Sequence, residues 1–238
     1  MIFYCNGEKI KINNNKRKIG HGSEGIVYRI GDSTYKIYYE SALRDNYGLK
    51  EHHHQYLSTI PTKQIVMPEH AIYDEFGNYV GYSAPFIEGN QKDKTGISLL
   101  DKKVFLDNLR ELSNDLKLLS DYLVVCADVQ PINYVYNQNE EKMYIIDPGR
   151  YKHHIFIEHD KYYHQNMEQF GYLLDLLIMS EIYKYKPIDS KRKQILLKNY
   201  ISNERKKSKL NPLEFYEKNL EDYPNVYEYV KSLNKYIR

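Results

Sequence analysis

Short apolar runs separated by turns fill the first part of the chain. Alternating and β-branched residues predict strands, and we expect these over residues 2–5, 10–12, 26–30, 34–39, 65–66, 71–73 and 79–87. Gly31-Asp32 and the stretch from Glu75 to Asn78 supply turn residues between neighbouring strands. The polar residues 40–59, which end before Pro61, are long enough for one helix. This part therefore predicts an antiparallel sheet with one helix.

After Gly89 the spacing of apolar residues changes to that of helices. A first stripe recurs at steps of three and four residues, namely Phe105, Leu109, Leu112, Leu116 and Leu119. We expect this helix to open at Ser98, with Asp101 three residues on as a capping box. A second stripe consists of Phe170, Leu173, Leu174, Leu177 and Ile178. Two short strands, 134–136 and 143–146, are expected between these helices, and the charged tail 191–238 is expected to be helical.

Together these patterns predict an α+β chain in two parts, residues 1–88 and 89–238, with a ligand site between them near Gly89. Among the 238 residues, Lys and Arg number 34 against 32 Asp and Glu, so net charge gives no reason to expect a nucleic-acid partner. The N-terminus has no signal-peptide pattern, and no apolar run is long enough for a membrane span. The two cysteines, Cys5 and Cys126, suit a reducing compartment, and we expect a cytoplasmic protein.

A glycine-rich motif lies between two strand signals. Gly20, Gly22, Gly25 and Val27 fit G-x-G-x-x-G-x-V, and a β-branched run follows instead of the helix that a dinucleotide fingerprint requires. Glycines in such a hairpin let backbone N–H groups approach phosphate oxygens without a Cβ in the way. A plain glycine-rich turn would have the same sequence, so the motif alone leaves both readings open.

Three further segments make the hypothesis of a phosphate-binding loop more specific. Lys36 follows in the next strand, although a lone strand lysine is usually solvated. Asp128 and Asn133 then belong to a D-x-x-P-x-N segment, and Asp147 ends an apolar strand in D-P-G. A phosphate cover, a cationic anchor, a base and two metal ligands are the parts that phosphoryl transfer needs.

With these motifs in this order, the region from about residue 10 to residue 171 resembles the eukaryotic-like protein-kinase superfamily. The resemblance implies a bilobal protein-kinase-like fold, with an antiparallel β-sheet N-lobe carrying one helix and a mainly α-helical C-lobe. It also implies that the chain uses ATP and Mg²⁺. Asp128 would be the catalytic base, and Asn133 and Asp147 would be the metal ligands. Lys36 would contact the α- and β-phosphates.

The resemblance assigns further residues to the nucleotide site. Glu51, in the predicted helix, would be the ion-pair partner of Lys36, with Glu40 as the less favoured substitute. The glycines Gly20, Gly22 and Gly25 would form the nucleotide loop. The residues assigned to the adenine are Val27 as its cover, Ala84 at the back of the pocket, and the Pro85 carbonyl and Ile87 amide as hinge groups.

Several positions depart from the family pattern. Cys126-Ala127 replaces the His-Arg that precedes the catalytic aspartate, and Gln130 stands where serine/threonine kinases commonly carry a lysine. Pro148 replaces the aromatic residue of D-F-G. Only nineteen positions separate Asp147 from the segment beginning at Asn166, which resembles the D-x-x-S-x-G helix start, and no A-P-E motif is present. These differences argue against a full peptide-docking platform, while all the motifs assigned to nucleotide binding are present.

We therefore expect a Mg²⁺-ATP-dependent kinase that phosphorylates Ser or Thr hydroxyls on a protein, including its own chain. The alternatives are a kinase for a small-molecule hydroxyl, favoured by Gln130 and the missing A-P-E, and a nucleotide-binding pseudokinase. Transfer of AMP from an inverted nucleotide also remains open. The presence of Lys36, Asp128, Asn133 and Asp147 argues against a decayed site.

Overall fold

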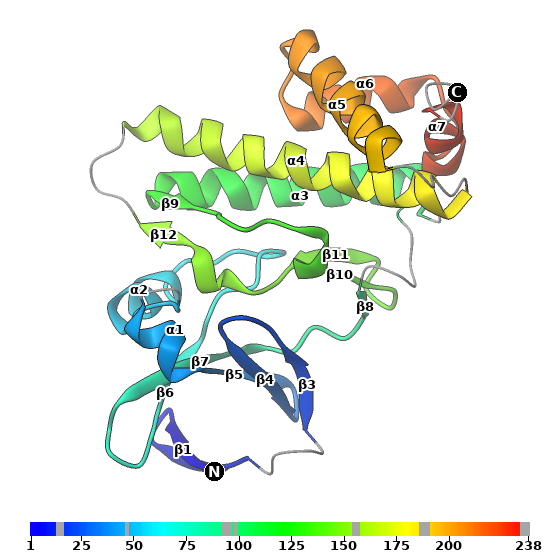
Figure 1. The fold of residues 1–238 in the computed structure, drawn as a ribbon. Coiled ribbons are helices and arrows are strands. Elements are labelled where there is room, and N and C mark those ends of the chain that lie inside the picture. The colour runs from blue at the N-terminus through cyan, green and yellow to red at the C-terminus, as the bar shows by residue number, and fades with distance from the viewer. Residues whose placement is uncertain are drawn as a thin grey trace.

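The computed structural model describes residues 1–12, 17–45, 48–91, 97, 100–153, 158–185 and 191–233. An antiparallel sheet forms the lower part in Figure 1, and long helices form the upper part. The short strands β8 to β12 lie between them. The predicted α+β class is confirmed, with the sheet in the first part of the chain and most of the helical residues in the second.

The sheet has the strand order β2-β1-β6-β7-β5-β4-β3. Its strands are β1 (Ile2–Cys5), β2 (Glu8–Lys11), β3 (Lys18–His21), β4 (Gly25–Ile30), β5 (Ser33–Tyr38), β6 (His70–Tyr73) and β7 (Tyr79–Pro85). Strand β3 was not predicted. The expected strand at residues 65–66 is wrong, because Ile65 forms only an isolated bridge with Ile145. Gly31 and Gly77 take positive φ in the turns that join β4 to β5 and β6 to β7, as the turn residues suggested.

One helix was predicted over residues 40–59, but the structure contains two, α1 (Glu40–Arg44) and α2 (Glu51–Leu57). The break contains Gly48, where a Cβ would lie 3.2 Å from the ring of Tyr38. The backbone N–H of Leu49 donates to the Tyr38 hydroxyl at 2.9 Å, a bond that a continuous helix would not leave available. Packing against β5 therefore overrides the helical pattern.

The second part contains α3 (Lys102–Asp121), α4 (His159–Tyr185), α5 (Lys191–Ser208), α6 (Pro212–Glu221) and α7 (Val226–Leu233). Its strands are β8 (Asn90–Gln91), β9 (Val124–Val125), β10 (Tyr134–Asn137), β11 (Lys142–Ile145) and β12 (Lys152–His153). Helix α3 begins later than predicted. Asp101 is its N-cap, because its side chain accepts the Lys103 N–H at 2.7 Å, and Ser98 lies outside the described residues.

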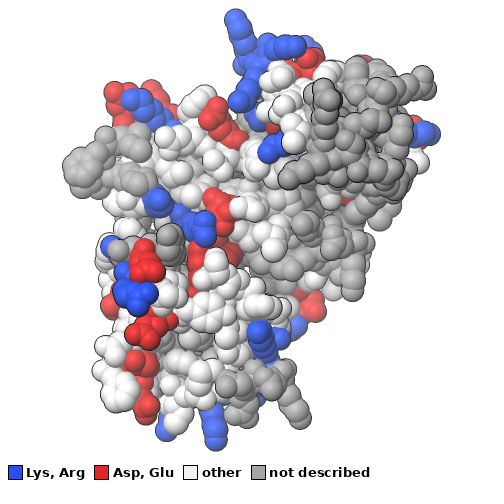
Figure 2. All heavy atoms as spheres, in the orientation of Figure 1, with Lys and Arg blue, Asp and Glu red and all other residues white. Residues whose placement is uncertain are grey.

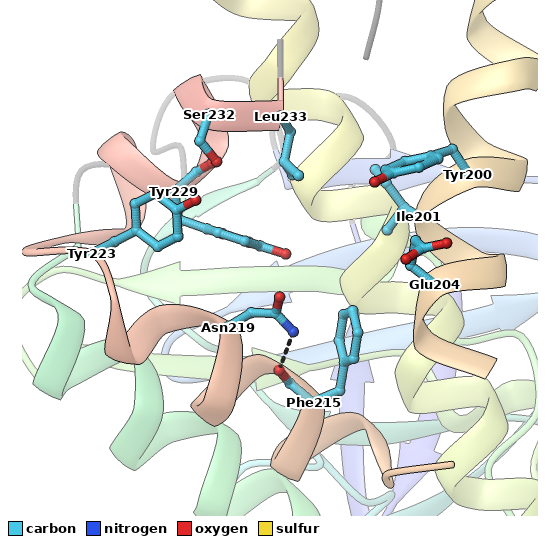
Figure 3. A pocket seen from close by; sticks show the side chains of 9 residues that line it. All are labelled: Tyr200, Ile201, Glu204, Phe215, Asn219, Tyr223, Tyr229, Ser232 and Leu233. Carbon is cyan, nitrogen blue, oxygen red and sulfur yellow. Dashed lines mark hydrogen bonds between the residues drawn. The ribbon is translucent and has the colours of Figure 1, made fainter. Parts of the chain in front are cut away.

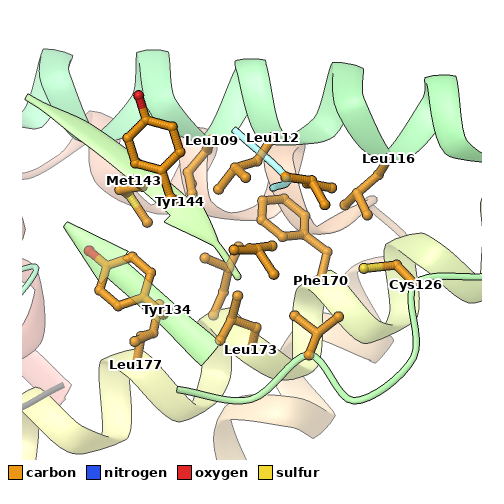
Figure 4. Packing of buried hydrophobic residues seen from close by; sticks show 14 of the residues in the cluster. Leu109, Leu112, Leu116, Cys126, Tyr134, Met143, Tyr144, Phe170, Leu173 and Leu177 are labelled. Atoms are coloured by element: carbon orange, nitrogen blue, oxygen red, sulfur yellow. The ribbon is translucent and has the colours of Figure 1, made fainter. Parts of the chain in front are cut away.

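Both predicted apolar stripes are buried in one core. Leu109, Leu112 and Leu116 of α3 pack with Phe170 and Leu173 of α4, beside the β10–β11 hairpin (Figure 4). A smaller cluster lies on the other face of the sheet and includes Phe3, Cys5, Ile12, Tyr28 and Ile72. The two helices therefore give the hairpin a rigid support. None of the described helices has the length and apolar character needed to cross a bilayer.

Candidate functional site

The site begins on one face of the sheet. Val27 of β4 lies opposite Lys36 of β5, which lies opposite Tyr82 of β7. Directly paired residues of antiparallel strands carry their side chains on the same face, so these three form a row. Ala84, two residues beyond Tyr82, belongs to the same face and is buried. The pairing therefore brings Val27, Lys36 and Ala84, which the resemblance assigns to the nucleotide site, to one face of the sheet.

The three glycines of the β3–β4 hairpin, Gly20, Gly22 and Gly25, differ in what the fold requires of them. A Cβ on Gly25 would lie 2.1 Å from the Ile37 carbonyl oxygen, so the close approach of β5 requires glycine there. A Cβ on Gly20 would meet nothing nearer than Val27 at 4.0 Å, and one on Gly22 would meet nothing within 4 Å. Neither has a positive φ. The packing of the chain itself thus explains Gly25 and leaves Gly20 and Gly22 unexplained.

Lys36 is buried between two carboxylates. Its Nζ lies 2.7 Å from Oε2 of Glu24, inside the glycine-rich loop, and 2.6 Å from Oδ1 of Asp147. The Lys36 and Glu24 side chains are 8% and 9% exposed, so water screens this pair weakly. The Lys36 ammonium group therefore links the glycine-rich loop to Asp147, which lies 111 positions after Lys36 in the sequence.

The predicted partner of Lys36 is wrong. Glu51 begins helix α2, and its carboxylate accepts a hydrogen bond of 2.7 Å from the Tyr73 hydroxyl of β6. In the described part of the chain, Lys36 forms ion pairs with Glu24 and Asp147, and neither Glu51 nor Glu40 forms one with it. The break at Gly48 separates α2 from the strand that carries Lys36. Glu24, in the glycine-rich loop, forms the ion pair with Lys36 that was expected of Glu51.

Asp128 and Asn133 lie in the segment between β9 and β10. Asp128 has a φ of 63°, a left-handed conformation that costs free energy in a residue other than glycine. Asn133 Nδ2 donates to the Asp128 carbonyl at 3.0 Å, and Gln130 Nε2 donates to the Asp128 carboxylate. These bonds fix the turn and leave Oδ2 of Asp128 3.7 Å from Arg150 Nε.

The β10–β11 hairpin brings Asn133 and Asp147 to the same end. Tyr134 pairs with Ile145, and the Ile146 N–H donates to the Asn133 carbonyl at 2.8 Å, so Asp147 follows directly. Asp147 also has a positive φ, 64°, and caps the short 3-10 helix η3 (Pro148–Arg150). Strain at both predicted aspartates is typical of residues held in place for a function.

The oxygens at this end suit a magnesium ion. Oδ1 of Asp147 accepts from Lys36 and, at 3.0 Å, from the Tyr82 hydroxyl. Burial and the Asp147 charge raise the pKa of Tyr82 well above its usual range, so the phenol stays a donor. Within the described residues, Oδ2 of Asp147 and Oδ1 of Asn133 receive no hydrogen bond. A carboxylate and an amide oxygen are hard ligands that Mg²⁺ accepts alongside phosphate oxygens and water.

No set of three His, Cys, Asp or Glu side chains among the described residues forms a complete protein metal cage. A magnesium ion here would therefore need ligands from a bound substrate, as is usual for ions that bridge phosphates.

Helix α4 holds the strand that leads to Asp128. Asn166 is fully buried in this helix. Its Oδ1 accepts the Cys126 N–H at 2.7 Å, and its Nδ2 donates at 2.9 Å to both the Val124 carbonyl and the Ser120 hydroxyl. The prediction that Asn166 lies at a helix start is wrong, because it lies within α4. Burial raises the pKa of the Cys126 thiol to about 12, so this cysteine is protonated and packs as an apolar residue.

The predicted hinge, residues 85–87, begins at the last residue of β7. The Thr34 hydroxyl donates to the Ala84 carbonyl at 3.0 Å, and the Phe86 N–H donates to the Asp32 carbonyl at 2.8 Å. Pro85 pairs with Ser33 at the end of the sheet, and Ile87 packs at the edge of the main core. The roles assigned to the Pro85 carbonyl and the Ile87 amide stay predictions.

Two residues at the site, Glu24 and Tyr82, were not predicted from the sequence. Arg150 follows directly after D-P-G in a basic stretch, and that position indicates a group that could meet an anionic substrate. Glu24 lies at one of the unspecified positions of the glycine motif, so the motif itself carried no information about it. Gly149 lies among their side chains. A Cβ at position 149 would be 2.9 Å from Lys36 Nζ and 3.0 Å from Glu24 Oε2, so a side chain there would displace the ends of both side chains.

The face in Figure 2 carries acidic and basic side chains close together over much of its described surface, with a basic group at its upper end. The last turn of α5 contributes Arg205, Lys206 and Lys207, but Arg205 is buried and paired with Asp175. A cavity of about 190 Å³ lies among α5, α6 and α7 and is lined by tyrosines, Phe215 and Glu204 (Figure 3). None of the predicted site residues lines it.

Comparisons with known proteins add no assignment. No protein-family model matches the sequence, and no curated protein matches it significantly.

Proposed function

We propose that this chain is an ATP- and Mg²⁺-dependent protein kinase that transfers the γ-phosphate to a Ser or Thr hydroxyl, its own included. The observation that carries the proposal is the direct contact of Lys36 with Asp147, at the end of the hairpin that also carries Asn133. The strained Asp128 lies on the segment leading into that hairpin. Four residues that the motifs selected separately are thus linked by hydrogen bonds, ion pairs and one hairpin.

The glycine-rich loop supports a phosphate ligand. Gly20 and Gly22 have open space where a Cβ would lie and no positive φ, so neither packing nor backbone conformation asks for glycine. Close approach of a ligand to the backbone N–H groups would explain glycine at both positions, because a side chain there would block the ligand. Val27 and Ala84 offer apolar surface beside Lys36 for the base of the nucleotide.

The chemistry follows from these positions. Lys36 binds the α- and β-phosphates. Asp147 and Asn133 would hold Mg²⁺, which would supply positive charge to offset that of the phosphates. Asp128 accepts the proton of the acceptor hydroxyl as its oxygen attacks the γ-phosphorus. The bond from that phosphorus to the oxygen bridging to the β-phosphate breaks, and ADP leaves with the electron pair. The chain itself contributes positioning and electrostatic stabilisation.

The test is incubation of the purified protein with γ-labelled ATP and Mg²⁺, followed by intact-mass analysis. Lys36→Ala and Asp147→Ala are the negative controls, and Asp128→Asn should lower kcat by orders of magnitude with nucleotide affinity retained. Phosphate gained by the wild type alone supports the proposal. A wild type that binds no nucleotide, or an Asp128→Ala variant with full transfer activity, refutes it.

A small-molecule hydroxyl is the second candidate acceptor. Gln130 binds the Asp128 carboxylate, and only nineteen positions separate Asp147 from Asn166, which leaves little chain for a peptide platform. Nucleotide binding and turnover with added sugars or aminoglycosides, without labelling of protein, would favour this candidate. Nucleotide binding without any turnover would favour the pseudokinase.

A further inference from the structure

Arg150 joins the glycine-rich loop to the segment that carries Asp128. It lies at the end of η3, three residues after Asp147, and its Nε donates to Oε1 of Glu24 at 2.7 Å. The same nitrogen lies 3.7 Å from Oδ2 of Asp128. The bond to Glu24 raises the pKa of Arg150, so the guanidinium is charged throughout the physiological range. One cation thus contacts two separate parts of the site.

Arg150 and Lys36 differ in the donors that they leave unused in the nucleotide-free chain. The ammonium of Lys36 is buried and already shared between Glu24 and Asp147. The Arg150 side chain is 45% exposed, and in the described part of the chain its two Nη atoms make no hydrogen bond. A guanidinium presents a planar fork of N–H donors that matches two phosphate oxygens. Arg150 therefore has donors available beside Asp128.

A cation at this place answers a specific need of phosphoryl transfer. Charge spreads over the oxygens of the transferring group, and donors fixed nearby stabilise it. Gln130, which binds Asp128 directly, is a neutral amide and supplies no charge. Among the described residues, the cation that forms an ion pair with Asp128 is Arg150.

We propose that Arg150 is a catalytic residue that binds the terminal phosphate of the nucleotide and stabilises it during transfer. This inference rests on the proposed kinase function and extends it. Glu24 holds the guanidinium in the nucleotide-free chain, and the terminal phosphate takes over the free Nη donors when it arrives. The contact selects triphosphates over diphosphates, because a diphosphate has no group at this position.

The test compares the affinities of Mg²⁺-ADP and of a Mg²⁺-bound, non-hydrolysable ATP analogue by isothermal titration calorimetry. Arg150→Ala should lower the affinity for the triphosphate analogue about 10- to 100-fold, the loss expected for charged hydrogen bonds, and change the ADP affinity less than about threefold. Arg150→Lys should recover part of the triphosphate affinity, because it keeps the charge and loses the fork.

Arg110→Ala is the matched control. Arg110 lies on α3, its side chain is 50% exposed, and its Nε also donates to a glutamate, Glu217, at 2.7 Å. Its replacement should change neither affinity. If Arg150→Ala lowers both affinities equally, or neither, the role of Arg150 is refuted while nucleotide binding stands. A wild type that binds neither ligand refutes the kinase function and this inference together.

Discussion

Replacing Glu24 and Glu51 in turn by glutamine shows which carboxylate serves Lys36. Both changes keep the size of the side chain and remove one negative charge. Glu24 accepts from Lys36 at 2.7 Å and from Arg150 at 2.7 Å, whereas Glu51 accepts from the Tyr73 hydroxyl. The resemblance to protein kinases implied Glu51, and the structure favours Glu24, so the two variants give opposite expectations.

The structure sets the size of each effect. The bond between Lys36 and Glu24 is buried and charged, and bonds of this kind contribute about 1.5–3 kcal/mol. The half-exposed Arg150 adds about 1 kcal/mol or less. Glu24→Gln should therefore lower the free energy of unfolding by about 1.5–4 kcal/mol. Glu51→Gln should cost about 1 kcal/mol or less, since the amide oxygen still accepts from Tyr73.

Urea unfolding followed by circular dichroism measures these differences, and a double-mutant cycle assigns them. Each glutamate variant is combined with Lys36→Met, which fills similar space without the charge. Glu24 and Lys36 should show a coupling energy of about 1–3 kcal/mol, and Glu51 and Lys36 a value near zero. A larger coupling to Glu51 than to Glu24 would show that the reasoning from the glycine-rich loop is wrong.

Further predictions concern the loop, the support and the pH response. Gly25→Ala should lower the free energy of unfolding by about 2 kcal/mol or more, because its Cβ would lie 2.1 Å from a backbone oxygen. Gly22→Ala should leave this free energy unchanged and weaken nucleotide binding. Equal unfolding midpoints for the two variants would contradict this contrast. Asp115→Ala should lower the free energy of unfolding in urea by about 3 kcal/mol or more, because its buried carboxylate accepts hydrogen bonds from three backbone N–H groups that would lose their partner. A decrease below about 1 kcal/mol would contradict that role. Burial lowers the pKa of His54 from 6.5, so the unfolded chain binds more protons and stability should fall as pH drops through about 6.5, by at most about 1.4 kcal/mol per pH unit. His54→Phe should reduce this slope in unfolding curves measured from pH 5 to 8, and an unchanged slope would exclude His54 as its source.

Periodicity predicted those elements whose residues face one large core. The stripes from Phe105 to Leu119 and from Phe170 to Ile178 are buried as expected, because burial on one face imposes the helical spacing directly. The predicted single helix over residues 40–59 failed where a tertiary contact decides. The hydroxyl of Tyr38 binds the backbone of Leu49, and no local pattern records that bond.

The candidate site divides in the same way. Lys36, Asp128, Asn133 and Asp147 lie in ordered motifs, and the structure links them. The partner of Lys36 depends on how far the glycine-rich loop folds over the sheet, which sequence spacing does not determine. Glu24 and Lys36 form their ion pair beside Gly149, which has no side chain to displace theirs.

The net charge of this cluster determines which ligands it can bind. Three carboxylates, Glu24, Asp128 and Asp147, face two cations, Lys36 and Arg150, so the cluster carries one net negative charge. A nucleotide triphosphate alone would add further negative charge to it. Binding such a ligand therefore calls for divalent cations, and the oxygens of Asp147 and Asn133 that receive no hydrogen bond from the described residues are where the fold can hold one. In the nucleotide-free chain the Glu24 carboxylate pairs with both cations, and under the proposed function phosphate oxygens would compete with it for them.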